Sequence, residues 1–117
     1  MTCLEDIQQK ERTLLDKEDT LTSEGKQLQR IQEQYSDQFR DATRFFERLT
    51  YQFQQSNERS FFESLSDEFS QKSRQIMERL ELDGDELHTQ KRTIERQRDD
   101  LAYEKQRFQK EESENEY

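Results

Sequence analysis

A seven-residue apolar repeat in the first half of the chain constrains the fold more than any other feature. It begins at Ile7 and returns at every seventh position up to Leu49. A companion row, offset by alternating steps of three and four, is polar through much of the N-terminal half and aromatic at Phe39, Phe46 and Phe53. Two such rows are typical of a coiled-coil helix. They predict a helix over about residues 3–55. The repeat consists of Ile7, Leu14, Leu21, Leu28, Tyr35, Ala42 and Leu49.

The second half carries the same pattern in reverse order. One of its rows is apolar at Phe62, Phe69 and Ile76 and then turns polar, whereas the other is apolar in its C-terminal part. These rows predict a second helix over about residues 60–112, followed by a frayed tail at 113–117. The second row consists of Ser66, Ser73, Leu80, Leu87, Ile94, Leu101 and Phe108.

A single register matches the two halves. If the chain folds back in its middle so that residue i faces residue 115 − i, apolar positions face apolar ones and polar positions face polar ones. Examples are Phe53 with Phe62 and Leu14 with Leu101. The sequence therefore predicts an all-α fold, an antiparallel two-helix coiled-coil hairpin that forms one domain over residues 1–117. Its seam near the bend is expected to contain Phe39, Phe46, Leu49, Phe53, Phe62, Phe69, Ile76 and Leu80.

The bend is marked by a repeated phrase. Residues 45–53 and 61–69 both read F-F-E-x-L-x-x-x-F, and the residues between them include no large apolar side chain. That intervening stretch contains Ser56 and Asn57, residue types that favour turns and helix caps. We expect the bend near residues 55–60, with two aromatic patches packing against each other beside it.

Gly84 is the one credible interruption of the second helix. Glycine costs a helix interior about 1 kcal/mol relative to alanine, and Asp85 would suit the cap of a restarted helix. Two interpretations follow: a tolerated kink, or a true break that divides the hairpin into shorter helices.

Composition excludes several classes of protein. Hydrophobic residues make up 27% and charged residues 40% of the chain, against about 45 to 50% and about 25% in ordinary globular domains. A net charge of −9 argues against binding to nucleic acid. No apolar run approaches the roughly 20 residues that span a bilayer, so no membrane insertion is expected. The single cysteine, Cys3, suits a reducing compartment. We expect a cytoplasmic protein, with export alongside a cargo left open.

The sequence provides little for catalysis. His88 is the only histidine and Cys3 the only thiol, and the hairpin would hold them apart. The acidic group around Asp83 and Asp85 lacks the ligand spacing of a calcium loop. We therefore expect no catalytic residue, no cofactor and no metal site, and a protein that is not an enzyme.

Several apolar residues fall outside the seam, and Phe45, Phe61 and Leu65 among them cluster near the bend. In the arm ends only one row of the seam is apolar, so a lone hairpin would bury little there. We expect helices of another chain to complete this surface by docking against it. The predicted partner-binding residues are Phe45, Tyr51, Phe61, Leu65, Leu15, Ile31, Met77 and Tyr103.

The chain resembles the small α-helical proteins encoded beside LXG-domain toxins of the Gram-positive type VIIb secretion system. The resemblance rests on the length, the two long helices, the double phenylalanines at 45–46 and 61–62, and the run Arg98-Asp99-Asp100-Leu101-Ala102-Tyr103-Glu104-Lys105. The chain has no tryptophan and no W-x-G at its bend, so it resembles the partner that is not of the WXG100 type. An aromatic residue followed four positions later by an acid, the export signal of the sister partner, is present only as Phe108 and Glu112.

Two functions follow from these observations. The resemblance implies a chaperone-like targeting factor that, with a second small WXG100-like helical protein, binds the helical N-terminal LXG domain of one cognate toxin. The alternative is a structural homo-oligomer in which hairpins pair into a four-helix bundle. A homodimer is an option in either case when the chain is alone.

Overall fold

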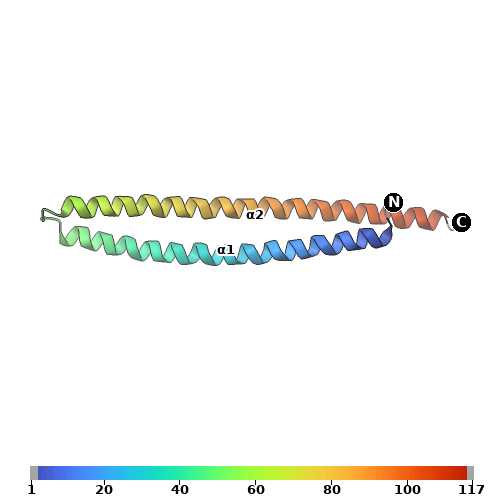
Figure 1. Cartoon of the computed structure of the whole chain (residues 1–117), viewed down its shortest axis with the longest axis horizontal. Coiled ribbons are helices and arrows are strands. Elements are labelled where there is room, and N and C mark those ends of the chain that lie inside the picture. The colour runs from blue at the N-terminus through green and yellow to red at the C-terminus, as the bar shows by residue number, and fades with distance from the viewer. Residues whose placement is uncertain (1–2, 116–117) are drawn as a thin grey trace. The chain divides into compact units, whose positions relative to one another are not determined.

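The computed structural model describes residues 3–115, and these form two α-helices (Figure 1). Helix α1 spans Leu4–Gln52 and helix α2 spans Arg59–Asn115. The described residues contain no strand. The predicted all-α antiparallel two-helix hairpin is confirmed.

The helix ends differ slightly from those expected. Helix α1 ends at Gln52 rather than near residue 55, because the chain there changes to successive tight turns. Helix α2 extends to Asn115 rather than 112, through Glu and Ser residues that a helix tolerates. The part of the expected frayed tail at 113–115 is thus helical, and residues 116 and 117 lie outside the described residues.

The connection consists of residues 53–58 and overlaps the predicted bend. The amide of Ser56 donates to the carbonyl oxygen of Phe53 at 3.0 Å, which closes a turn. The Ser56 hydroxyl oxygen then accepts a hydrogen bond from the amide of Glu58 at 3.1 Å. This bond satisfies one of the amides left without a partner at the start of a helix. Ser56 therefore helps α2 to begin at Arg59.

The chain divides into two compact units, each built from one segment of α1 and one of α2. Unit 1 contains residues 1–25 and 85–117, and unit 2 contains Lys26–Gly84. In each unit the two segments run in opposite directions.

Unit 1 contains every buried apolar side chain of the described residues. Ile7 is fully buried, and Leu14, Ile94 and Leu101 are nearly so. Leu21 and Phe108 pack against them. All six residues belong to the apolar rows, and together they match the predicted register of Ile7 with Phe108, Leu14 with Leu101 and Leu21 with Ile94.

Ion pairs flank this core. Arg98 Nη1 lies 2.8 Å from Glu18 Oε2, and Lys105 Nζ lies 3.4 Å from Glu11 Oε1. The hydrogen bond to Glu18, reinforced by the charge of that carboxylate, raises the pKa of Arg98 above its ordinary value.

Unit 2 is held by aromatic contacts instead. Phe53 and Phe62 stack with ring centroids 4.6 Å apart, and Phe46 lies 5.1 Å from Phe69. Both pairs were predicted. Phe39 packs edge-on against Phe69 at 5.8 Å. Although unit 2 is rich in phenylalanine, all of its residues are half-buried or exposed.

The seam of unit 2 is open at Ile76. This residue was expected to face Phe39 within the seam, but 40% of its surface is exposed. Phe39 instead packs against Tyr35 and Phe69, and the adjoining seam positions Ala42 and Ser73 carry small side chains. The other predicted seam residues, Phe39, Phe46, Leu49, Phe53, Phe62, Phe69 and Leu80, are half-buried.

Gly84 does not break α2. The helix runs continuously through it, and no described glycine has a positive φ. The interpretation of Gly84 as a true break is therefore wrong. One turn earlier, the side-chain amide of Gln32 donates to the carbonyl oxygen of Leu80 at 3.2 Å and joins α1 to α2 within unit 2.

Candidate partner-binding surface

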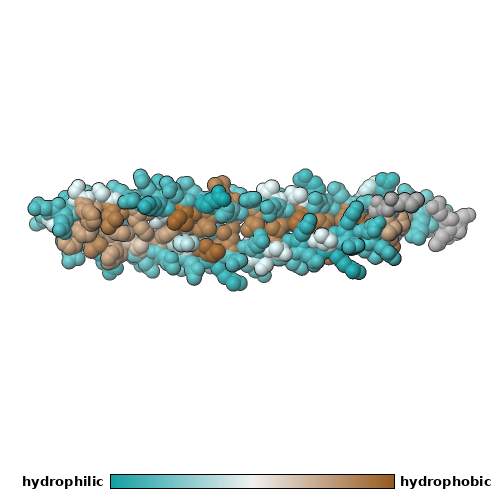
Figure 2. Space-filling model, in the orientation of Figure 1, coloured by the Kyte–Doolittle hydropathy of each residue, from teal (hydrophilic) through white to brown (hydrophobic). Residues whose placement is uncertain are grey.

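Most of the predicted partner-binding residues are exposed. Phe45, Phe61, Leu65, Leu15, Tyr51 and Tyr103 all present large apolar or aromatic surface to solvent. Ile31 and Met77 are half-buried. Figure 2 shows broad exposure of apolar residues in unit 2 at the end next to the connection. The structure therefore agrees with most of the predicted exposure, but it does not place these residues on one surface.

The off-seam apolar residues of unit 2 gather on one side. Phe45 and Ile31 each come one position before a residue of the seam row that contains Phe46, and Leu65 comes one position before Ser66 of the other row. In an antiparallel pair of helices these positions lie on the same side of the seam. Phe61 is one helical turn before Leu65 and shares its side.

Leu82, which is 60% exposed, lies on the same side. It is one turn beyond Arg79, which holds the position equivalent to that of Leu65. We call this side the apolar face of unit 2, and it contains Ile31, Phe45, Phe61, Leu65 and Leu82.

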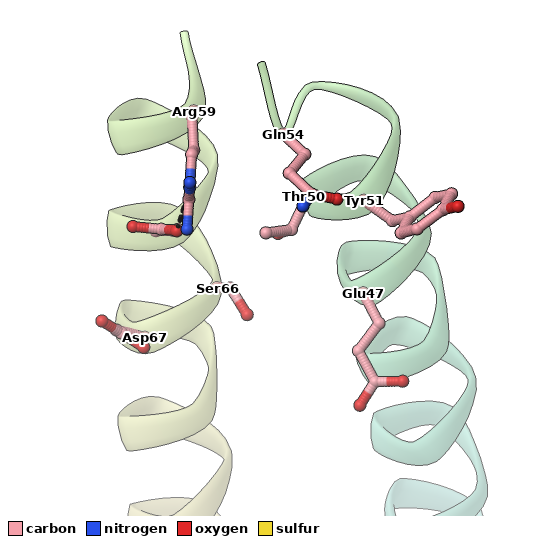
Figure 3. A pocket seen from close by; sticks show the side chains of 8 residues that line it. Glu47, Thr50, Tyr51, Gln54, Arg59, Ser66 and Asp67 are labelled. Carbon is pink, nitrogen blue, oxygen red and sulfur yellow. Dashed lines mark hydrogen bonds and ion pairs between the residues drawn. The ribbon is translucent and has the colours of Figure 1, made fainter. Parts of the chain in front are cut away.

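The other side of unit 2, which we call its polar face, forms an open hollow next to the connection (Figure 3). Arg59 Nε lies 2.8 Å from Glu63 Oε1 there. Tyr51 borders this hollow and points away from α2. Tyr51 is thus separate from the apolar face, as is Met77, which belongs to the polar side. The lining residues are Glu47, Thr50, Tyr51, Gln54, Arg59, Glu63, Ser66 and Asp67.

The two faces also differ in charge. The apolar face carries acids and bases in equal number, namely Asp41, Glu58 and Glu68 with Arg48, Lys72 and Arg79. The polar face has an excess of acids, namely Glu33, Glu47, Glu63, Asp67 and Glu81 with Lys26, Arg40 and Arg74. Only the apolar face combines exposed apolar residues with balanced charge, as expected for a surface that is covered by another protein.

Unit 1 has a groove that the sequence reasoning missed. It lies between α1 and α2, has a volume of about 600 Å³, and is lined in part by Leu21 and Ile94. Threonines border it on both helices, at positions 13, 20, 89 and 93. These small residues, two on each helix, were the only signal of it in the sequence. Of the remaining predicted residues, Leu15 and Tyr103 belong to unit 1.

The described residues contain no group of three His, Cys, Asp or Glu side chains that could hold a metal ion. Over residues 3–115, neither helix includes a stretch apolar enough to span a bilayer.

Comparison with known proteins places the chain in a family. No curated protein and no solved structure is similar to the chain. One family model matches residues 2–108, nearly the whole length. The chain therefore belongs to the family described as a protein of unknown function, DUF3958.

Proposed function

We propose that the chain is a non-enzymatic binding protein that uses the apolar face of unit 2 to hold a helical partner. The partner is the helical N-terminal LXG domain of a cognate toxin, and the chain acts as a targeting factor for type VII secretion together with a second small WXG100-like protein. The choice of an LXG domain depends on the resemblance in length, double phenylalanines and closing run. The choice of a protein partner depends on the surface itself.

One observation carries the proposal. Unit 2 has most of the phenylalanines of the chain, yet none of its side chains is buried, whereas unit 1 buries Ile7, Leu14, Ile94 and Leu101. An apolar residue left exposed contributes little to folding, and a cluster of such residues marks an interaction site. Phe45 is 51% exposed and Phe61 is 62% exposed, so half or more of the surface of each residue is free for a partner.

Docking of a helix against this face would be driven by burial of the two rings. An aromatic side chain buries about 150–250 Å² when fully covered, at about 25 cal/mol per Å². Covering the exposed part of each ring is therefore worth about 2 kcal/mol. The balanced charges around the rings, such as Arg48 and Glu68, would set the register of the partner helix and select the cognate toxin.

The test is capture of the untagged chain by a tagged LXG domain, followed by light-scattering mass of the eluted complex. The double variant Phe45→Glu with Phe61→Glu is expected to abolish capture and to leave helical content, measured by circular dichroism, close to that of the unaltered chain. Tyr51→Glu is the matched control, because it places an acid at an exposed aromatic position outside the apolar face. Normal capture of the double variant would remove this face from the proposal.

A further inference from the structure

We propose that, in the absence of another partner, two copies of this chain pair through the apolar face of unit 2. Their connections lie at the same end, and a two-fold axis runs parallel to the helices. The pairing uses the surface proposed for toxin binding, but it does not depend on the partner's being an LXG domain.

The geometry follows from the register within unit 2. Contacts of Phe53 with Phe62 and of Phe46 with Phe69 place residue i of α1 level with residue 115 − i of α2. A two-fold axis along the helices sets α1 of one copy over α2 of the second copy without changing these levels. Residues of the apolar face whose numbers add to about 115 therefore meet across the interface.

Apolar residues meet apolar residues in this arrangement. Ile31 of one copy comes within one helical turn of Leu82 of the second copy, and Phe45 comes within about one and a half turns of Leu65 of the second copy. Because the axis is two-fold, each contact occurs twice. Leu65 is 38% exposed and Leu82 is 60% exposed in the single chain, so both have surface to bury.

Opposite charges also meet. Arg48 comes level with Glu68 of the second copy, and Asp41 comes within a turn of Lys72 of the second copy. Within one chain, Glu68 and Lys72 form only an exposed ion pair at 3.1 Å, of a kind that contributes little to stability. Arg48 takes part in no ion pair among residues 3–115. These charges are therefore available to a second copy.

The polar face excludes the same pairing. There, the equivalent levels would bring Glu47 against Asp67 of the second copy, Arg40 against Arg74, and Glu33 against Glu81. Each of these contacts joins like charges, which oppose association. At every level compared, the apolar face brings opposite charges together, whereas the polar face brings like charges together. Only the apolar face is therefore self-complementary.

The experiment measures the mass of the untagged full chain by sedimentation equilibrium, with reductant present to keep Cys3 reduced. We expect a dimer of two-fold symmetry. Arg48→Glu alone and Glu68→Arg alone should each weaken dimerisation by about tenfold or more, because each sets like charges opposite one another. The double variant Arg48→Glu with Glu68→Arg should restore the dimer, since it exchanges the two charges. Arg74→Glu, on the polar face, is the matched control and should leave the dimer unchanged.

Two results would overturn the pairing. One is a single-chain mass at every concentration. The other is a dimer that withstands Arg48→Glu but is lost in Arg74→Glu. Circular dichroism of each variant separates loss of pairing from loss of folding. Since no toxin is present, failure here leaves the capture experiment to decide the proposed function independently.

Discussion

Phe53 stacks on Phe62 across the connection, with ring centroids 4.6 Å apart and an angle of 22° between the ring planes. Phe53 is the first residue of the connection and Phe62 lies in the first turn of α2, so this contact closes the hairpin at its bend. The next pair, Phe46 and Phe69, follows one heptad further along each helix. The stacked pair thereby sets the register that decides which residues of unit 2 share a face.

Removing one ring of this stack should destabilise the protein. Phe62→Ala is expected to lower the free energy of unfolding by about 2 kcal/mol, less than for a fully buried phenylalanine because Phe62 is half-buried. Urea denaturation followed by circular dichroism measures the change. Tyr51→Ala, at a residue that is 80% exposed, serves as the control and should change stability by less than about 0.5 kcal/mol. Equal effects of the two substitutions would contradict the role of the stack.

Leu14 and Leu15 are adjacent but should respond very differently to truncation. Leu14 belongs to the core of unit 1 and is 8% exposed, whereas Leu15 is 43% exposed. Leu14→Ala leaves a cavity among Ile7, Ile94 and Leu101 and should cost about 3 kcal/mol. Leu15→Ala should cost less than about 0.5 kcal/mol. A similar loss of urea resistance in both variants would show that the heptad phase in unit 1 is misassigned.

Much of the fold could be predicted because a coiled-coil seam is encoded by spacing alone. The rows through Ile7 and Leu101 define two helices, and one register pairs their apolar members. Spacing alone does not say which neighbours a side chain packs against, and Phe39 packs against Tyr35 and Phe69. Ile76 satisfies the repeat, yet it stays 40% exposed beside Ala42 and Ser73.

The candidate surface could be predicted only in part. Exposure of Phe45 and Phe61 follows from their positions outside the seam. Their separation from Tyr51 depends on which side of the seam each position occupies, and this requires the phase and the register together. Phe45 and Tyr51 both lie outside the seam, but they belong to two different faces.

Cys3 should give a disulfide-linked dimer when reductant is withheld. Its thiol is exposed, and because it is the only cysteine, the bond has to join two chains. Non-reducing gel electrophoresis should show the linked species, and Cys3→Ser should abolish it without changing the urea midpoint. Linked chains that persist in Cys3→Ser would point to a covalent bond of another kind.

Gly84→Ala should stabilise the protein by about 1 kcal/mol, the difference in helix propensity between the two residues. A Cβ at this position would lie 3.6 Å from Leu28 Cδ2, an ordinary van der Waals distance. Gly25→Ala is the companion variant, since its Cβ would meet nothing within 4 Å and should add about the same propensity term. The urea midpoint measures both changes. Loss of stability in Gly84→Ala alone would mean that the chain uses the glycine as a hinge.

Capture of Gly84→Ala by the tagged LXG domain extends the test to the bound state. Undiminished capture is expected, because an unbroken α2 already presents the apolar face of unit 2.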